Sequence, residues 1–194
     1  MDQALKWLEA GEIKSGEQVY KLQKKHNNSI LVVLFKSKDF ETEFKQKTLE
    51  ATLKDDNSDL AQNCRTTCQS SLPDAAVKAQ VWAELCDPNS KESLYTRRAK
   101  MSGFWVKSHS DLTEEYVDKF YDVLVDLNEK VTYKYMETFF YSMLPRNTVK
   151  DEHIVKLLSL KLSNPDTKSM FGNILQDGIE LLVRSKQIRE FAQQ

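Results

Sequence analysis

The stretch Pro73–Leu85 reads PDAAVKAQVWAEL and indicates the fold class more clearly than any other segment of this chain. Its apolar residues Val77, Val81 and Leu85 recur every four positions, and Trp82 widens the stripe by one residue. In a helix all four side chains share one face, whereas in a strand Val81 and Trp82 would point to opposite faces. The stretch therefore predicts an amphipathic helix.

The same spacing recurs along the rest of the chain. Only 5 Gly and 4 Pro occur in 194 residues, which argues against the many tight turns of a β domain. Each proline borders a periodic segment, because a missing N–H is tolerated at the start of a helix but not in its interior. We expect about eight to ten helices with short links, the last helix being the longest. The prolines are Pro73, Pro88, Pro145 and Pro165, and further stripes contain Val117, Phe120, Tyr121, Leu124, Met136, Phe139, Phe140, Met143, Ile154, Leu157, Leu158, Phe171, Ile174, Leu175 and Leu182.

Three polar signals mark expected helix starts. Ser71 precedes Pro73 and Asp74, Asp111 is followed three residues later by Glu114, and Thr148 is followed three residues later by Asp151. Side-chain oxygens at such positions accept hydrogen bonds from the free N–H groups of a first turn, and acidic groups suit its dipole. All three positions are therefore predicted to begin helices.

Helices joined by short links pack as antiparallel hairpins, and stacked hairpins form an α-solenoid of the HEAT or armadillo kind. The predicted fold class is all-α, with residues 1–194 forming a single helical-repeat domain. A closed helical bundle stays open as the alternative, because the sequence shows no clear internal repeat at a fixed period. The aromatic residues between Phe104 and Tyr141 are expected to fill the core rather than to bind a ligand.

The run Ile30–Phe35, ILVVLF, is the least certain part of this assignment. A short continuous apolar run fits a buried strand or a buried helix equally well by periodicity. A lone strand needs a partner, and no other segment alternates with period two over a useful length. We therefore predict a buried helix.

Charge and composition exclude several classes of partner. Lys and Arg number 28 and Asp and Glu number 29, so the formal net charge of −1 gives no broad attraction for nucleic acid or an anionic membrane. No stretch approaches the roughly 18 apolar residues that span a bilayer, and the N-terminus does not resemble a secretory signal. These features predict a soluble, cytoplasmic protein. An odd count of three cysteines predicts reduced thiols.

The sequence contains no recognisable catalytic or metal-binding motif. None of the three histidines belongs to an H-E-x-x-H helix, and Glu152 with His153 fits the solvated first turn of a helix. Cys64 and Cys68 are four residues apart but lack the further ligands of a structural zinc site, so buried free thiols are predicted. The glycines lack the spacing of a phosphate-binding loop. We predict no catalytic residue, no metal ligand and no cofactor within this chain.

A basic cluster beside apolar residues is the one local feature that invites a ligand. Arg97, Arg98 and Lys100 precede Trp105. Adjacent positions on a helix differ by about 100°, so the two arginines do not readily share a target. One interpretation places one arginine in a salt bridge between helices and the other in solvent. The other interpretation has one arginine facing a cavity, where its guanidinium group binds the anionic end of a peptide.

Several segments together resemble a known family. They are Ala4–Gly11, Gln23–His26, Pro73–Trp82 with its Lys-x-x-x-Trp spacing, Ser93–Tyr95, Met101–Trp105 with its Gly-Phe-Trp element, and Lys119–Tyr121. In this order they resemble the C-terminal helical domain of M1-family zinc aminopeptidases of the aminopeptidase N type. The resemblance covers nearly the whole chain, and its motifs are packing elements rather than catalytic signatures.

The resemblance implies a HEAT-like superhelix that closes over the catalytic domain of a zinc metallopeptidase and controls peptide access to its chamber. The zinc ion, its ligands and the general base would belong to that catalytic domain of a larger polypeptide, of which this chain is the C-terminal part. Its partners would be the catalytic domain and peptide substrates. Arg97, Arg98 and Trp105 are the candidate chamber-lining or peptide-contacting residues.

A free-standing helical-repeat adaptor that binds other proteins is the alternative function. An accessory domain should expose an apolar patch where the catalytic domain docks, which we expect near the N-terminal helices. An adaptor should instead have polar helices at both ends, and the apolar Leu5 and Trp7 argue against that.

Overall fold

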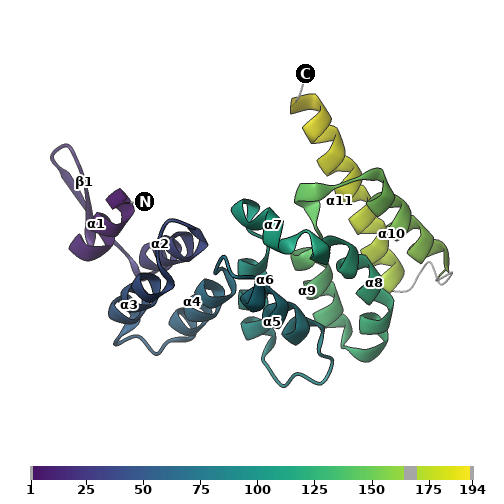
Figure 1. Ribbon diagram of the computed structural model, residues 1–194, viewed down its shortest axis with the longest axis horizontal. Coiled ribbons are helices and arrows are strands. Elements are labelled where there is room, and N and C mark those ends of the chain that lie inside the picture. Colours follow the sequence, from purple (N-terminus) through teal and green to yellow (C-terminus); the bar gives the residue numbers. More distant parts are fainter. Residues whose placement is uncertain (1, 164–169, 193–194) are drawn as a thin grey trace.

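The computed structural model describes residues 2–163 and 170–192 of the chain, and this part is mostly helical, as predicted (Figure 1). It contains eleven α-helices, slightly more than expected because α7 is a single turn. The longest is α11, as predicted, whereas Pro165 lies outside the described residues. The helices are α1 (Asp2–Ala10), α2 (Lys24–Lys36), α3 (Thr42–Leu53), α4 (Asp59–Ser70), α5 (Ala75–Cys86), α6 (Leu94–Phe104), α7 (Ser110–Thr113), α8 (Glu115–Lys130), α9 (Tyr133–Met143), α10 (Asp151–Ser163) and α11 (Met170–Ala192), with short 3-10 turns η1 (Lys107–His109) and η2 (Arg146–Thr148).

A small β-hairpin follows α1 and corrects the expectation that no segment forms paired strands. Strands β1 (Glu12–Ser15) and β2 (Gln18–Lys21) pair antiparallel, with Ser15 opposite Gln18. The two-residue turn has Gly16 at φ +61°, and no non-glycine residue described has a positive φ, which is the type II′ pattern. Four-residue strands are too short for a period-two search, so Gly16 was the available signal.

The run Ile30–Phe35 lies inside α2, which confirms the predicted helix. Leu31, Leu34 and Phe35 are fully buried, and Val33 on the other side is exposed. Spacings of three and four residues place the buried side chains on one helical face. The apolar run is continuous because the exposed position, Val33, is also occupied by an apolar residue. The continuity therefore does not indicate a strand.

Of the three predicted helix starts, the one at Thr148 and Asp151 is followed by α10, which begins at Asp151, and the other two were wrong by a few residues. Asp74, not Ser71, is the N-cap of α5, since its carboxylate accepts hydrogen bonds from the N–H groups of Ala76 at 2.7 Å and Val77 at 3.1 Å. Ser71 instead ends α4. Asp111 lies within the single turn α7, and α8 begins only at Glu115.

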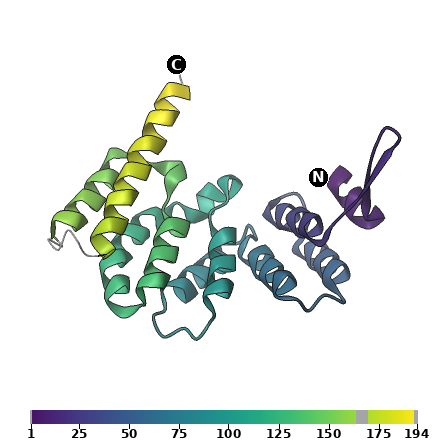
Figure 2. The same ribbon diagram turned by 180° about the vertical axis from the view of Figure 1, so that it is seen from behind.

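The helices are arranged in a row, and alternate helices pack against each other. Helix α2 packs on α4, α4 on α6, α6 on α9 and α9 on α11, while on the second side α8 packs on α10. Figure 1 shows the hairpin and α1 at one end of an elongated molecule and α11 at the other, and Figure 2 shows the same row from behind. The first and last helices are therefore far apart.

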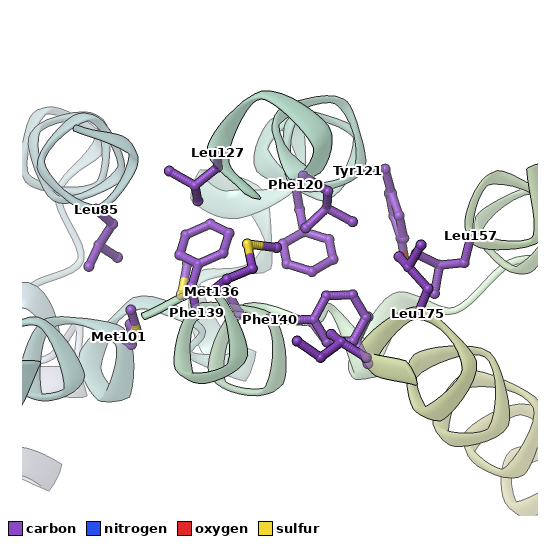
Figure 3. Close-up of a cluster of buried hydrophobic side chains, with 14 of the residues drawn as sticks. Leu85, Met101, Phe120, Tyr121, Leu127, Met136, Phe139, Phe140, Leu157 and Leu175 are labelled. Carbon is purple, nitrogen blue, oxygen red and sulfur yellow. The ribbon is translucent and has the colours of Figure 1, made fainter. Parts of the chain in front are cut away.

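Two clusters of buried apolar side chains run along this row. The smaller cluster joins α2, α3 and α4 through residues such as Leu31, Phe35 and Leu49. The larger cluster extends from α5 to α11, and Figure 3 shows its centre, where rings of α8 and α9 meet. Phe120 and Phe139 stack at 5.9 Å between ring centroids. The predicted aromatic core is confirmed, with Tyr133 an exposed exception.

Four cations at successive helix junctions bind the end of the preceding helix. Lys45 on α3 donates to the carbonyl of Ser37 at 2.6 Å, and Lys78 on α5 donates to that of Ser70 at 2.6 Å. Arg65 on α4 and Arg97 on α6 donate in the same way to the carbonyls of Leu53 and Leu85, at 2.7 and 2.9 Å. The last carbonyls of a helix lack partners within it and carry its negative dipole end, which these cations neutralise.

These four cations reveal a repeat that the sequence pattern did not show. Each lysine binds a carbonyl eight residues earlier, and each arginine binds one twelve residues earlier. The two lysines are 33 residues apart and the two arginines 32 residues apart. Two consecutive helix pairs, α3 with α4 and α5 with α6, therefore use equivalent side chains at equivalent positions.

His109 connects η1 to the end of α2. Its buried ring donates from Nε2 to the carbonyl oxygen of Lys36 at the end of α2, at 2.8 Å. Lys38, just beyond α2, pairs with Asp111 of α7 at 3.1 Å. The Nδ1 atom of His109 has no hydrogen-bond partner among the described residues. Elements of the smaller cluster therefore hold η1 and α7.

We expect the protein to lose stability as the pH falls below about 6.5, in part through His109. Burial lowers the pKa of His109 below its ordinary value of 6.5, although the bond to the Lys36 carbonyl opposes this. The unfolded chain therefore takes up a proton before the folded chain does, and folding is penalised by up to about 1.4 kcal/mol per pH unit. Substituting His109→Gln should flatten the decline in urea unfolding measured from about pH 7.5 to about pH 5.

The variant His26→Gln, at an exposed position in the first turn of α2, is measured in parallel so that the change of slope can be compared with that of another histidine substitution. The buried His153 also has a lowered pKa, through burial, so part of the decline should persist in the His109 variant. An unchanged slope in His109→Gln would show that His109 does not titrate between these pH values.

Candidate functional site

Arg97 is mostly buried, and it forms part of the wall of a cavity of about 300 Å³ together with Glu92 and Tyr135. Its side chain is 5% exposed, and its Nη2 atom donates to the carbonyls of Glu84, Leu85 and Asp87 at 2.9 to 3.2 Å. Its guanidinium carbon lies 3.6 Å from the ring centroid of Tyr135. Arg97 therefore closes the end of α5, and among the described residues it forms no ion pair.

Arg98 and Trp105 lie on the side of α6 that faces α9. Arg98 is exposed and donates from Nη2 to the hydroxyl of Thr138 at 3.3 Å. Trp105 is half-buried and donates from its indole N–H to the carbonyl of Met143 at 2.9 Å. The structure thus brings two of the three candidate residues to one pair of helices, α6 and α9, and separates Arg97 from them.

A groove of about 420 Å³ lies on another side of α6, between α4 and α5, with Glu84 and Lys100 in its wall. Lys100 is held there by Glu84 at 2.7 Å and Glu92 at 2.5 Å. Burial lowers the pKa of Lys100, but its bonds to both carboxylates outweigh this and raise the pKa. Burial raises the pKa of Glu84, but hydrogen bonds from Lys100 and Gln80 outweigh this and lower it. Nothing in the sequence predicted this groove, because Glu84, Glu92 and Lys100 come from two helices and the loop between them.

The structure revises the interpretation of Glu152 and His153. Glu152 is exposed in the first turn of α10, as expected, but His153 is only 2% exposed. Its ring stacks on Tyr121 with 5.1 Å between centroids, and its Nδ1 accepts a hydrogen bond from the N–H of Lys150 at 3.2 Å. His153 is therefore buried against the larger cluster, and the polar residues around it in the sequence gave no sign of this burial.

The three cysteines are free thiols, as predicted. Cys64 and Cys68 are buried in α4, and Cys86 is half-buried at the end of α5. Within residues 2–163 and 170–192, no three side chains from His, Cys, Asp and Glu come together in a way that could hold a metal ion.

Large exposed apolar side chains gather at the two ends of the molecule. We expected such residues near the N-terminal helices, and the structure places a second group at the far end, on α10 and α11. Between them, only Tyr95 and Tyr133 are exposed among the large apolar residues described. The N-terminal group is Val19, Tyr20, Val33, Phe44 and Leu60, and the C-terminal group is Val155, Leu158, Leu162, Met170, Val183, Ile188 and Phe191.

None of the described helices has the length and the apolar character needed to cross a membrane. No family model and no curated protein matches this sequence. The description of this protein therefore depends on its fold and its surface. It is an elongated row of helices with large apolar residues exposed at each end.

Proposed function

We propose that this chain is an α-solenoid of the HEAT type that serves as the non-catalytic C-terminal domain of an M1-family zinc aminopeptidase. The observation that carries the solenoid is the repeated cation. Lys45 with Arg65, and Lys78 with Arg97, occupy equivalent positions in consecutive helix pairs. A closed bundle gives no reason for such a repeat, whereas a solenoid stacks equivalent units.

The row of alternate helices supports the same arrangement. Each helix of the row α2, α4, α6, α9 and α11 packs on the next member, so every pair contacts its neighbours and the two ends stay apart (Figure 1). In a closed bundle the first and last helices would share one core. The chain instead has two clusters in succession along its length.

The apolar groups at both ends support an accessory domain over an adaptor. A free-standing repeat protein needs terminal helices with a polar outer face. Here α11 exposes Ile188 and Phe191, which are 62% and 79% accessible, and β2 exposes Val19 and Tyr20. In the proposed enzyme the catalytic domain of the same polypeptide covers the N-terminal group. That domain would also supply the zinc ion and all catalytic residues.

The proposed role in catalysis is to cover the active-site chamber. A cover excludes water and large substrates from the site, and it limits which peptides enter. Of the two candidate arginines, Arg98 is the exposed one, so it is the residue we assign to contact a peptide carboxylate. Trp105 links the end of α6 to the end of α9 through its hydrogen bond to the carbonyl of Met143.

The first test of this proposal is the size of the native polypeptide. An antibody against this chain should detect a band several times larger than 22.5 kDa in source cells. The immunoprecipitate should remove N-terminal residues from peptides, lose this activity with a chelator and regain it with zinc. A band at 22.5 kDa without activity would contradict the accessory domain and favour the adaptor.

In that native enzyme, Arg98→Ala should raise the KM for peptide substrates about tenfold and leave the KM for a single aminoacyl amide unchanged. The reason is that only a peptide has a distal carboxylate to pair with Arg98, and a charge-assisted hydrogen bond contributes roughly 1.5–3 kcal/mol. Lys107→Ala, an exposed cation on η1, is the matched control and should change neither KM. If Arg98→Ala and Lys107→Ala changed the KM values of both substrates equally, Arg98 would not contact the peptide carboxylate.

A further inference from the structure

Two thiols of α4 lie side by side. Cys64 and Cys68 are four residues apart, on one face of the helix, and their Sγ atoms are 4.0 Å from each other. The side chain of Cys68 is fully buried and that of Cys64 is 6% exposed. The thiol of Cys64 also donates a weak hydrogen bond to the carbonyl of Asn28 on α2, at 3.8 Å. The pair is thus held between two helices.

A groove between α2 and α4 leads to this pair. Its volume is about 430 Å³, and Cys64 forms part of its wall together with the apolar Val32, Val33 and Leu60. The wall is mainly apolar, so a small ion enters without competing charged side chains lining the groove. Cys64 is the thiol that an incoming ligand meets first, and Cys68 lies directly behind it.

The surroundings favour negative charge on Cys64. The S–H group of Cys68 hydrogen-bonds to the Cys64 sulfur and lowers the pKa of Cys64, an effect that burial opposes and Arg65 assists. The same bond and burial raise the pKa of Cys68, while the positive charge of Lys36 acts in the opposite direction. A thiolate is the form that binds metals, so Cys64 is the first ligand, and the bound ion itself has to displace the proton of Cys68.

We propose that Cys64 and Cys68 form a two-thiolate site for a soft, thiophilic cation of low coordination number, with Cu(I) as its representative. A metal–sulfur bond of about 2.3 Å lets one ion bridge sulfur atoms up to about 4.6 Å apart. A linear two-coordinate ion would hold the two sulfur atoms about 4.6 Å apart, so the observed 4.0 Å has to widen by roughly 0.6 Å when the ion binds. Thiolate ligands select Cu(I), whereas a structural zinc ion needs about four ligands. Among the described residues, no His, Asp, Glu or further Cys completes a group of three ligands with this pair.

Binding is a simple exchange of protons for the ion. Two thiols lose their protons, two sulfur–copper bonds form, and the product carries a net charge of −1. No electron is transferred, so neither an oxidant nor a reductant is required once the ion is supplied as Cu(I). Phenylarsine oxide tests the same pair independently, because its arsenic atom condenses with two thiols and releases one water molecule.

The test is an anaerobic titration of the full 194-residue protein with Cu(I), in competition with a chromophoric Cu(I) chelator. We expect one ion per chain, bound by the wild type and by Cys86→Ser. The variants Cys64→Ser and Cys68→Ser should each bind roughly 100-fold more weakly or worse, since losing a ligand costs at least as much as losing an outer-shell partner. Zinc should bind far more weakly than Cu(I) to the wild type.

Several results would overturn the site. They are no Cu(I) binding by the wild type, unchanged binding in either single variant, loss of binding in Cys86→Ser, or zinc binding as tight as that of Cu(I). Circular dichroism and thermal unfolding confirm that each variant is folded. Where a cysteine variant does not fold, the arsenical is used on the wild type instead. An adduct that resists excess monothiol and maps to both Cys64 and Cys68 by peptide mass supports the pair, and an adduct at Cys86 contradicts it.

Discussion

Replacing Gly103 with valine is expected to lower the free energy of unfolding by about 3 kcal/mol or more. Gly103 lies in α6 where this helix contacts α4. A Cβ atom there would be 2.3 Å from the Ser70 hydroxyl oxygen, 2.6 Å from the backbone carbonyl oxygen of Thr67 and 2.8 Å from the Ser71 hydroxyl oxygen. Both hydroxyl groups already bond to that carbonyl, at 3.1 and 2.7 Å. The two helices would therefore have to separate.

Urea unfolding measures this change, and the neighbouring Ser102 provides the control. Ser102 is exposed on the same helix, so Ser102→Ala should alter the free energy of unfolding by less than about 0.5 kcal/mol. Gly103→Ala should have a smaller effect than Gly103→Val, because alanine gains about 1 kcal/mol of helix propensity over glycine. A valine variant as stable as the wild type would show that α4 and α6 do not approach this closely.

Replacing Lys78 with methionine is expected to cost about 3 kcal/mol at neutral pH. The ammonium group of Lys78 donates to the carbonyls of Ser70 at 2.6 Å and Gly103 at 2.9 Å, at the ends of α4 and α6. Methionine fills similar space but cannot donate, so two buried carbonyls would lose their partner, at roughly 1–3 kcal/mol each. Removing the buried charge recovers part of this loss.

The cost of Lys78→Met should also increase with pH. Burial and the nearby charge of Lys36 lower the pKa of Lys78 from its ordinary 10.5 to about 8. Between these values the unfolded chain keeps a proton that the folded chain has released, so the wild type gains stability as the pH rises. The difference in unfolding free energy between the two proteins should therefore widen from about pH 8 towards pH 10.5.

Lys91→Met, in the exposed loop before α6, is the control for charge removal and should change stability little. A difference between wild type and Lys78→Met that stays constant across the window would show that Lys78 keeps an ordinary pKa. A small difference at every pH would show that the two carbonyls find other partners.

The spacing of apolar residues predicted the helices well, because one-sided burial imposes a 3.6-residue period on each of them. Val81, Leu85, Phe120 and Phe139 all lie in the core to which their stripes assigned them. The hairpin at residues 12–21 was missed because its short strands are mostly exposed and bury no regular pattern. The spacing of apolar residues reflects burial, so an element that buries few side chains cannot be predicted from that spacing.

The candidate site was predicted less well, and the two arginines show why. Arg97 and Arg98 are adjacent in a basic, polar segment, and both are typical of a binding surface. The structure buries Arg97 against the end of α5 and exposes Arg98 near α9. A one-residue step rotates the side chain by about 100°, and only the neighbouring helices determine which direction is interior.

The sequence by itself determined that the chain is helical, where most of its helices lie, that its aromatic residues form the core, and that it contains no familiar catalytic motif. These properties follow from local spacing and residue type. Only the tertiary structure determined the order of helix packing, the lysine and arginine repeat, the burial of His109 and His153, and the pairing of Cys64 with Cys68 beside a groove. Each of these depends on which carbonyl, ring or helix lies opposite a given side chain, and that depends on contacts between segments far apart in the chain.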